Sequence, residues 1–432
     1  MAKRVLIVGG GYVGLYAALV LQRKLRRGEA DVTLVNPESY MTYQPFLPEA
    51  AAGSLEPRHV VVPLRRVLPK IRIVNGTVTA LDHDTRRATV ASPGGPPCDI
   101  DYDEVVIAVG AVARTLPIPG LVEHAVGFTT VEEAIYLRNQ VLHCLDVAGS
   151  TSDERARQRA LTFVFVGAGY AGVEAIAELA DLARYATRYY PTLSPADMRW
   201  VMVDAAPRIL PELSPGLADY TTRQLRSAGI EVLTSTRLES IDDGEVLLSN
   251  GERFPSDTVV WTAGVQANPV VTTFGLPVDD RGRLAADEHL QIRGVPGAWS
   301  AGDCAGVPDL VGGGVCAPTA QHAVRQARRL GANLVAHLRS EPLTAYRHKN
   351  IGAVATLGLH KGVAEVFGVK LRGWPAWFMH RTYHVSQVPT VNRKVRVIAD
   401  WTLALLFRRE VVSLGALHTP RAAFARSRPP LP

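Results

Sequence analysis

The strongest constraint on the fold is a strand–glycine turn–helix–strand pattern that the chain contains twice. We expect these segments at 3–8, 9–14, 15–25 and 31–35 in the first copy, and at 161–166, 167–172, 173–182 and 199–203 in the second. Each turn has the spacing GxGxxG, directly follows a β-rich run and precedes an apolar helical pattern. This context is typical of dinucleotide-binding domains. The chain is therefore predicted to be an α/β protein with two such domains.

A glycine turn that opens a helix points unpaired backbone N–H groups and the positive end of the helix dipole at a pyrophosphate. In the first turn Gly9 permits the tight bend, Gly11 lets phosphates approach the backbone, and Gly14 allows close packing of the helix. The corresponding residues of the second turn are Gly167, Gly169 and Gly172. A lone turn of this spacing also occurs in plain loops, but here each copy has its strand, its helix and a partner. Both turns are predicted to bind dinucleotides.

The residue that ends the second strand of each unit is expected to hydrogen-bond the adenosine ribose. In the second unit this residue is Asp204, whose carboxylate suits a free 2′-hydroxyl and repels a 2′-phosphate, so NADH is favoured over NADPH; Arg208 softens that preference. In the first unit it is Asn36, which is either a weaker ribose ligand or simply a turn former. Because Gly172 lies unusually far from Asp204, we expect an inserted helical hairpin at 185–197.

Two dinucleotide sites in one chain indicate electron transfer between cofactors, and FAD with a nicotinamide is the common pairing. Gly302 and Asp303 follow a predicted strand, and an Asp at such a strand end is typical of a ligand to the ribityl chain of FAD. A simple helix cap is the alternative role for Asp303. Gly110 and Gly264, at the ends of further predicted strands, complete the set of expected cofactor-binding glycines.

These motifs predict how the chain is divided. We expect an FAD-binding domain in two parts, at 1–115 and 266–346, with an NADH-binding domain between them at 116–265. A C-terminal module for membrane association is expected at 347–432. The polar stretch 149–159 is expected to be a surface loop before the second glycine turn.

Composition excludes several other classes of protein. The chain has 432 residues, of which 47% are hydrophobic and 20% charged, as expected for a globular protein with a large core and not for a disordered one. Its four cysteines contain no CxxC pair, so we expect no disulfide framework and no metal site. No apolar run reaches the roughly 18–20 residues of a spanning helix, and no signal peptide is expected before the first strand.

Positive charge is concentrated at the C-terminal end. Residues 370–432 contain eleven Lys and Arg against two acids, a local charge of +9, so the other 369 residues sum to −3. The short apolar run 397–407 has basic flanks, and Trp374, Trp377 and Phe378 precede it. This combination favours an interfacial anchor on an anionic membrane surface, with a dimer or core helix as the alternative. Nucleic acid is not an expected partner, because no nucleic-acid-binding fold accompanies the basic run.

The segments 9–14, 167–178, 261–269 and 301–303 together resemble the flavoproteins with two dinucleotide-binding domains. More narrowly, residues 3–415 resemble the type II NADH:quinone oxidoreductases. Three segments carry this narrower resemblance: 320–325 is similar to the quinone-site motif AQxAxQ, 172–174 to the segment with a glutamate beside flavin and nicotinamide, and 373–401 to the tail that forms membrane-binding and dimer-forming helices.

The resemblance implies an FAD enzyme of the respiratory chain that takes hydride from NADH and passes two electrons to a membrane quinone without pumping protons. It also implies a peripheral position on the cytoplasmic face of the cell membrane and a homodimer. Glu174 and Gln321 would be the catalytic residues, Gln321 and Arg325 would contact quinone, and Ala320 would let its helix approach the flavin. Arg325 departs from the motif, which has Gln at this position.

Helical geometry places Gln321 and Arg325 about 40° apart on one face of the predicted helix 319–337, with Gln326 rotated by about 140° from Gln321. A polar surface helix is the alternative for this segment, and compensation of the helix N-terminus is the alternative for Glu174. Two rival functions also stay open: a related reductase with another acceptor, such as sulfide:quinone or ferredoxin-type enzymes, and an NADH-sensing flavoprotein with little turnover.

Overall fold

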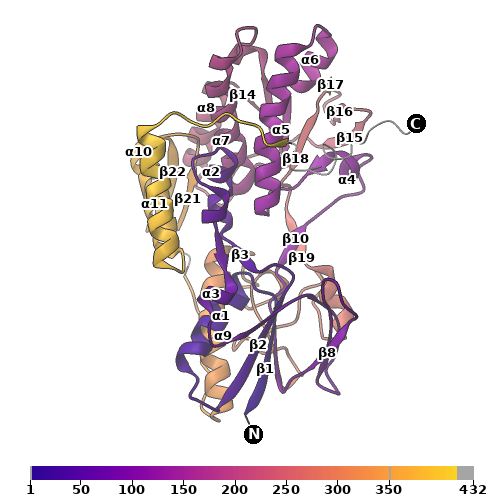
Figure 1. Ribbon diagram of the computed structural model, residues 1–432, viewed down its shortest axis with the longest axis vertical. Coiled ribbons are helices and arrows are strands. Elements are labelled where there is room, and N and C mark those ends of the chain that lie inside the picture. Colours follow the sequence, from indigo (N-terminus) through magenta and orange to yellow (C-terminus); the bar gives the residue numbers. More distant parts are fainter. Residues whose placement is uncertain (1, 350–351, 416–432) are drawn as a thin grey trace, which may run out of the picture. The chain divides into compact units, whose positions relative to one another are not determined.

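The computed structural model describes residues 2–349 and 352–415. The chain forms two compact units, each assembled from three separate segments (Figure 1). The first unit comprises Met1–Thr42, Val61–Arg114 and Val265–Asn350, and the second comprises Tyr43–Val60, Thr115–Gly264 and Ile351–Pro432. Each unit is built around one parallel sheet.

The sheet of the first unit has five parallel strands in the order β20-β9-β1-β2-β5. Their bounds are Ala298–Ser300, Glu104–Ile107, Lys3–Val8, Ala30–Asn36 and Arg72–Asn75. In β1 the residues from Val5 to Val8 are all buried, which is the continuous apolar pattern of a strand covered on both faces. Helices α1 (Tyr12–Lys24) and α9 (Ala320–Leu338) pack together, as Figure 1 shows, and Gly331 of α9 lies against the α1 backbone.

Smaller strands complete the first unit. An antiparallel meander consists of β6 (Thr77–Asp82), β7 (Arg87–Ala91) and β8 (Cys98–Asp101). A two-stranded ribbon consists of β10 (Ala111–Ala113) and β19 (Val265–Ala267). A second short pair consists of β3 (Tyr40–Thr42) and β4 (Val61–Pro63). The short helix α3 (Leu64–Val67) follows β4.

The sheet of the second unit has the same plan. Its order is β11-β18-β12-β13-β14, all parallel, with bounds Ala125–Val126, Thr258–Trp261, Thr162–Val166, Arg199–Val203 and Ile230–Leu233. An antiparallel meander follows its last edge strand: β15, β16 and β17 (Leu238–Asp242, Glu245–Leu248, Arg253–Pro255). Its helices are α4 (Leu121–His124), α5 (Val131–Ser150), α6 (Glu154–Ala160), α7 (Tyr170–Ala186) and α8 (Pro215–Ser227).

The predicted duplication is therefore confirmed, and it is more extensive than the glycine turns indicated. In each unit the strand before the turn is central, the next strand pairs on one side of it, and a three-stranded meander precedes the strand on its other side. The α/β fold with parallel, Rossmann-like sheets follows from this arrangement.

The C-terminal residues of the second unit form a small antiparallel sheet and two helices. The strands are β21 (Gly352–Thr356), β22 (Gly362–Val366) and β23 (Val369–Arg372), and the helices are α10 (Trp374–Gln387) and α11 (Val391–Leu406). Helix α10 packs on β22 and β21, and α7 packs on β21. Figure 1 shows α10 and α11 side by side, and α2 (Leu47–Ala51) belongs to the same unit.

Two local expectations are wrong. No helical hairpin is inserted at 185–197: the gap before Asp204 arises because α7 continues to Ala186, and only two 3-10 turns, Thr187–Tyr189 and Pro195–Asp197, follow it. The stretch 149–159 is not a plain loop either, because the Asp153 carboxylate caps α6 by accepting hydrogen bonds from the backbone N–H groups of residues 155 and 156.

Candidate functional site

The first glycine turn lies in the first unit and has no room for side chains at two positions. A Cβ on Gly9, which has φ +103°, would overlap the carbonyl of Ala108, and a Cβ on Gly14 would overlap the carbonyl of Gly9. Gly11, which precedes α1, has nothing within 4 Å of its Cβ position. The turn is thus tightly packed on the protein side and open where a pyrophosphate would approach.

The second glycine turn repeats this geometry in the second unit. A Cβ on Gly167 (φ +108°) would lie 2.5 Å from the carbonyl carbon of Thr262, and one on Gly172 would overlap the carbonyl of Gly167. The Thr262 hydroxyl also donates to the Gly167 carbonyl at 2.8 Å. Gly169 faces open space, as Gly11 does. Both turns therefore provide the open backbone that a dinucleotide requires.

Both strand-end residues contact their own glycine turn. Asp204 accepts hydrogen bonds from the backbone N–H groups of Ala168 (2.5 Å) and Ala206 (2.7 Å). Asn36 accepts one from Gly10 N–H (2.7 Å), and its amide donates to the Glu38 carbonyl (2.8 Å). A carboxylate has about four lone-pair positions, so Asp204 keeps acceptor capacity for ribose hydroxyls, whereas the single amide oxygen of Asn36 keeps less.

Asp303 lies in the 3-10 turn Gly302–Cys304, which follows β20, and its carboxyl has no partner among the described residues. Burial raises its pKa, and the side chain has no hydrogen bond or ion pair with any residue that the structure describes. Gly302 beside it packs against Val13 of α1, so Asp303 lies close to the first turn. A partly buried carboxyl without a protein partner fits a role in holding hydroxyl groups of a cofactor.

The sequence did not reveal how this loop is held. Gln326 is almost completely buried on α9, and its side-chain oxygen accepts a hydrogen bond from Gly302 N–H at 2.8 Å. The 140° rotation from Gln321 points Gln326 toward the protein, where it anchors the loop that carries Asp303. The only available signal was the extra glutamine directly after Arg325.

Helix α9 begins where the sequence predicts. The Thr319 hydroxyl accepts a hydrogen bond from the His322 backbone N–H at 3.3 Å and caps the helix ahead of Ala320. The Arg325 guanidinium donates to the Gln321 carbonyl at 3.1 Å, so these two residues lie on one side of the helix.

Gly110, with φ +67°, lies at the end of the segment that packs beside Gly9, whereas Gly264, with φ +98°, follows β18 in the second unit.

Glu174 lies in the second unit, buried in the first turns of α7. One carboxylate oxygen accepts a hydrogen bond from Thr356 N–H at 2.8 Å and lies 3.0 Å from His380 Nε2. The Thr356 hydroxyl donates to Glu178, one helical turn further along α7. Glu174 and Gln321 belong to different units, so the predicted catalytic pair stays a prediction.

Comparisons with known proteins decide the family. Residues 3–327 match the family described as pyridine nucleotide-disulphide oxidoreductase. The type II NADH:quinone oxidoreductase of Staphylococcus aureus is 30% identical over 393 residues, which cover 89% of this chain and 95% of that protein. The chain belongs to the type II NADH:quinone oxidoreductases. A relative from Mycobacterium tuberculosis with the same description is 28% identical over 444 residues, covering 98% of this chain and 92% of that one.

Solved structures agree on the fold of this type II NADH:quinone oxidoreductase. NDH2 from Plasmodium falciparum, in complex with NADH, gives a TM-score of 0.89 at 18% identity and covers 95% of this chain and 100% of that one. The sulfide:quinone oxidoreductase from Aquifex aeolicus gives 0.71 at 17% identity, with coverage of 95% and 96%. At these identities the likeness shows the fold alone. Membership of the family makes the chain an NADH dehydrogenase that uses NAD(H) and a flavin.

Three of the four cysteines of this oxidoreductase are buried in surroundings that disfavour the thiolate. Burial raises the pKa of Cys304, raises that of Cys316 to about 11 and raises that of Cys144 to about 12. A thiol is nucleophilic only as a thiolate, so these three cysteines have the environment of inert buried residues. The described residues contain no disulfide and no group of three or more His, Cys, Asp or Glu that could hold a metal ion.

A second polar cluster fastens the C-terminal helices to α2 within the second unit. The Arg381 guanidinium donates to the buried Glu49 carboxylate at 3.0 Å, and the indole N–H of Trp401 donates to the same carboxylate oxygen at 2.5 Å. The guanidinium also lies over the rings of Trp377 (4.1 Å) and Trp401 (4.7 Å). The sequence pattern does not predict this cluster, because Glu49 is more than 300 positions away from its partners.

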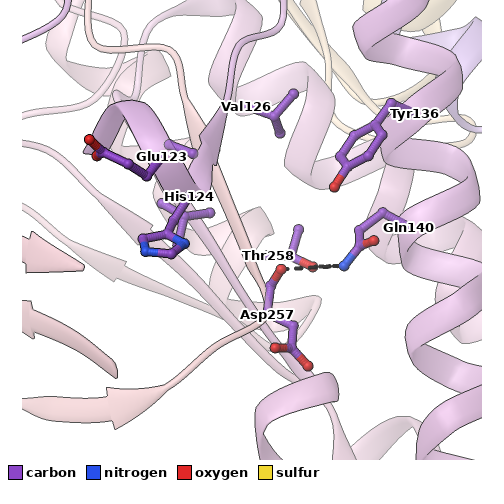
Figure 2. A pocket seen from close by; sticks show the side chains of 9 residues that line it. Glu123, His124, Val126, Tyr136, Gln140, Asp257 and Thr258 are labelled. Atoms are coloured by element: carbon purple, nitrogen blue, oxygen red, sulfur yellow. Dashed lines mark hydrogen bonds between the residues drawn. The ribbon is translucent and has the colours of Figure 1, made fainter. Parts of the chain in front are cut away.

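A pocket of about 250 Å³ lies in the second unit, beside the start of strand β18 (Figure 2). Tyr136 and Gln140 of α5 line it together with Thr258, the first residue of β18, and Gln140 donates to the Thr258 hydroxyl at 3.4 Å. The second glycine turn follows the carboxyl end of β12, which runs parallel to β18. The pocket, at the amino end of these strands, is therefore at the opposite end of the strands from the predicted nicotinamide site.

Proposed function

We propose that this chain oxidises NADH through bound FAD and passes the two electrons to a membrane quinone without pumping protons. The observation that carries the proposal is the similarity to named type II NADH:quinone oxidoreductases over almost the full length of both proteins. The duplicated dinucleotide-binding plan supports it, because an electron transfer between flavin and nicotinamide needs two such sites.

FAD would be held by the first unit. The open backbone at Gly11, between Gly9 and Gly14, would contact the pyrophosphate, Asn36 would contact the adenosine ribose, and Asp303 would contact the ribityl hydroxyls. Gly110 and Ala320 are the small residues that would allow close approach to the ring. When bound, the flavin supplies a two-electron carrier that accepts hydride and reduces quinone.

NADH would be held by the second unit, through Gly167, Gly169, Gly172, Asp204 and Gly264. The protein contributes chiefly position, because hydride transfer requires the nicotinamide carbon to be about 3–3.5 Å from its acceptor and needs no protein acid or base. The remaining acceptor capacity of Asp204 favours NADH over NADPH.

Quinone would be reduced beside α9, where Gln321 and Arg325 share one side of the helix. Both side chains can donate a hydrogen bond to a quinone oxygen. Glu174 is the carboxylate proposed to act near the flavin and nicotinamide. In domain terms we propose FAD binding for 1–115 and 266–346, NADH binding for 116–265 and membrane association for 347–432.

Membrane association is supported by the exposed face of α11. Val391, Val395, Ile398 and Leu405 recur at helical spacing and are all exposed, and Leu406 and Phe407 extend the apolar face at the helix end. Trp374 and Phe378 of α10 are exposed as well. No helix of the described residues is long and apolar enough to cross a bilayer. With the basic residues around it, this face fits an interfacial anchor on the anionic cytoplasmic face of the cell membrane, and it could also take part in a homodimer.

The proposed function predicts a kinetic split at Gln321. We expect NADH to bleach the flavin of the loaded protein quickly, NADPH to do so more slowly, and quinone analogues in liposomes to reoxidise it quickly. The Gln321→Ala variant should keep bleaching by NADH but reoxidise about ten-fold more slowly, the value of one lost hydrogen bond. Stopped-flow absorbance measures both steps, and Gln158→Ala, at an exposed glutamine of α6, is the control. Fast bleaching with stalled reoxidation of the unchanged protein would contradict the quinone assignment and favour a protein acceptor or an NADH sensor.

The proposed anchor predicts that charge on α11 releases the protein from membranes. Ile398→Asp and Leu405→Asp should each weaken binding to anionic phospholipid vesicles by about ten-fold or more, because burying such a side chain contributes about 1.5–3 kcal/mol. Vesicle co-sedimentation measures this, and Val122→Asp, at an exposed valine of α4, is the matched control. Unchanged vesicle binding together with a loss of dimer mass would show that α11 is a subunit interface instead.

A further inference from the structure

Two short segments of the first unit contain positive charge and no negative charge. Residues 22–28 and 64–72 include eight Lys and Arg without one acid, a local charge of +8, whereas residues 1–369 as a whole sum to −3. We call these eight residues the basic surface, because all of them are exposed: Arg23, Lys24, Arg26, Arg27, Arg65, Arg66, Lys70 and Arg72.

The fold brings the two segments together within the first unit. The first segment covers the end of α1 and the loop before β2, and the second covers α3 and the start of β5. Gln22 of α1 donates to the Val67 carbonyl of α3 at 3.0 Å, and Figure 1 shows these two helices together. Strand β5 pairs with β2, with Arg72 opposite Thr33. The basic surface is therefore one region of the unit, although its halves are some 40 positions apart in the chain.

The acids of this region leave most of the charge uncompensated. Arg65 donates to the Ile73 carbonyl at 2.9 Å, but the other seven side chains have no hydrogen bond or ion pair with a residue that the structure describes. Glu29 is already paired with Arg339, with 2.6 Å between their atoms. Asp31, at the start of β2, is a single exposed carboxylate. Seven cations therefore face solvent.

Local helix electrostatics explain only part of this charge. The negative end of the α1 dipole favours cations in its last turn, where Arg23 and Lys24 lie. The other six lie in loops, in the four-residue helix α3 and in β5, outside that turn. Like charges within a Debye length, about 8 Å at physiological salt, repel one another and attract anionic partners.

The composition of the basic surface distinguishes between anionic partners. A specific protein interface has an apolar or aromatic centre inside a polar rim, but 22–28 and 64–72, all of which the structure describes, expose no large hydrophobic side chain. Single-stranded nucleic acids stack their bases on aromatic rings, and these segments contain none. An anionic phospholipid surface requires neither, since its negative potential attracts clustered Lys and Arg by itself.

We propose that the basic surface binds the anionic headgroups of a phospholipid membrane, as a contact of the first unit that is separate from the apolar face of α11. The choice of lipid rests on the proposed function, because an enzyme that reduces a membrane quinone works at a bilayer. The two contacts differ in physical kind: salt screens the attraction of the basic surface, whereas the burial of apolar side chains of α11 is not screened. The first unit therefore adds a salt-sensitive preference for anionic lipid.

Vesicle co-sedimentation of the full-length, FAD-loaded protein tests the proposal with one variant that carries four substitutions: Arg27→Ala, Arg66→Ala, Lys70→Ala and Arg72→Ala. Each Lys or Arg near an anionic surface is worth about five-fold in affinity, so this variant should bind phosphatidylglycerol vesicles at least ten-fold more weakly at low salt. The difference should disappear on phosphatidylcholine vesicles, and also at about 1 M salt, where the Debye length is about 3 Å. Circular dichroism checks the fold, and if the variant does not fold, Arg27→Ala with Lys70→Ala, both in exposed loops, should still weaken binding about five-fold or more.

A matched control removes the same charge at four exposed positions outside the basic surface: Arg223→Ala, Arg237→Ala, Arg253→Ala and Arg281→Ala. It should bind phosphatidylglycerol vesicles within about two-fold of the unchanged protein, because charges more than a Debye length from the lipid contribute little. Equal weakening in both variants would show that net charge alone sets vesicle binding, and would overturn the basic surface as a site.

The remaining outcomes separate this contact from the proposed function. Vesicle binding by the four-fold variant that equals that of the unchanged protein would overturn the lipid assignment and favour an acidic protein as the partner. In stopped-flow, the variant should be reoxidised more slowly by quinone in limiting anionic liposomes but at the normal rate by a water-soluble quinone analogue. Failure of both quinones to reoxidise the unchanged protein would overturn the proposed function, while vesicle binding would still decide the basic surface.

Discussion

The Gly14→Ala variant is expected to lose both flavin and stability, whereas Gly11→Ala is expected to lose flavin alone. A Cβ on Gly14 would overlap the Gly9 carbonyl, and this neighbour is backbone that cannot rotate away. Overpacking of this kind costs typically about 1–3 kcal/mol and sometimes more. A Cβ on Gly11 meets no protein atom within 4 Å, and the φ of −70° at this position suits alanine.

The two variants therefore separate packing from phosphate binding. For Gly11→Ala we expect an unfolding free energy within about 0.5 kcal/mol of the unchanged protein. Its FAD affinity should fall by about 5- to 150-fold, which corresponds to about 1–3 kcal/mol of overlap with the pyrophosphate. Denaturant titration by circular dichroism and flavin fluorescence measure the two quantities. Gly169→Ala, at the corresponding open position of the second turn, is the control and should impair NADH binding while flavin stays bound. Equal FAD affinity in Gly11→Ala would show that the first turn does not hold the pyrophosphate.

The Glu178→Gln variant is expected to be more stable than the unchanged protein at alkaline pH. Burial, with a contribution from nearby Glu49, raises the pKa of Glu178 from 4.5 to about 7, and Arg409 and Arg381 offset this only in part. Because the folded state holds the proton more tightly, the contribution of this carboxyl to stability is full below about pH 4.5 and is lost as the pH rises to about 7. A shift of this size corresponds to roughly 3 kcal/mol.

The free energy of unfolding of Glu178→Gln should therefore equal that of the unchanged protein below about pH 4.5. The variant should become progressively more stable than the unchanged protein between about pH 4.5 and 7, and its advantage should stay near 3 kcal/mol above that range. Thermal and denaturant unfolding across this range measure it. His380 acts in the same direction but is present in both proteins, so its effect cancels in the difference. Glu239→Gln, at an exposed position of β15, should show no such pH dependence. A constant difference across the whole range would mean that Glu178 does not ionise with a raised pKa.

The two dinucleotide-binding sheets were predictable because their signals are local. The bounds of β1 and β13 were predicted to the residue, and Gly14 and Gly172 are each required by an overlap with the first glycine of their own turn, five positions earlier. The start of α9 was equally local, since the Thr319 cap and the first helical turn are adjacent in the chain. The error at 185–197 was a matter of length: the gap before Asp204 indicated extra residues but not that α7 itself was longer.

Sequence alone determined the α/β class, the duplication, the glycine turns and the family resemblance, because each depends on residues within a few positions of one another. Only the tertiary structure decided which charges are buried and with whom. In the sequence Arg381 belongs to a basic tail and His380 is one of twelve histidines; in the structure Arg381 pairs with Glu49 and His380 lies beside Glu174, 206 positions away (380 − 174). Such pairs form because a buried charge needs a partner, and the fold, not the local pattern, supplies it.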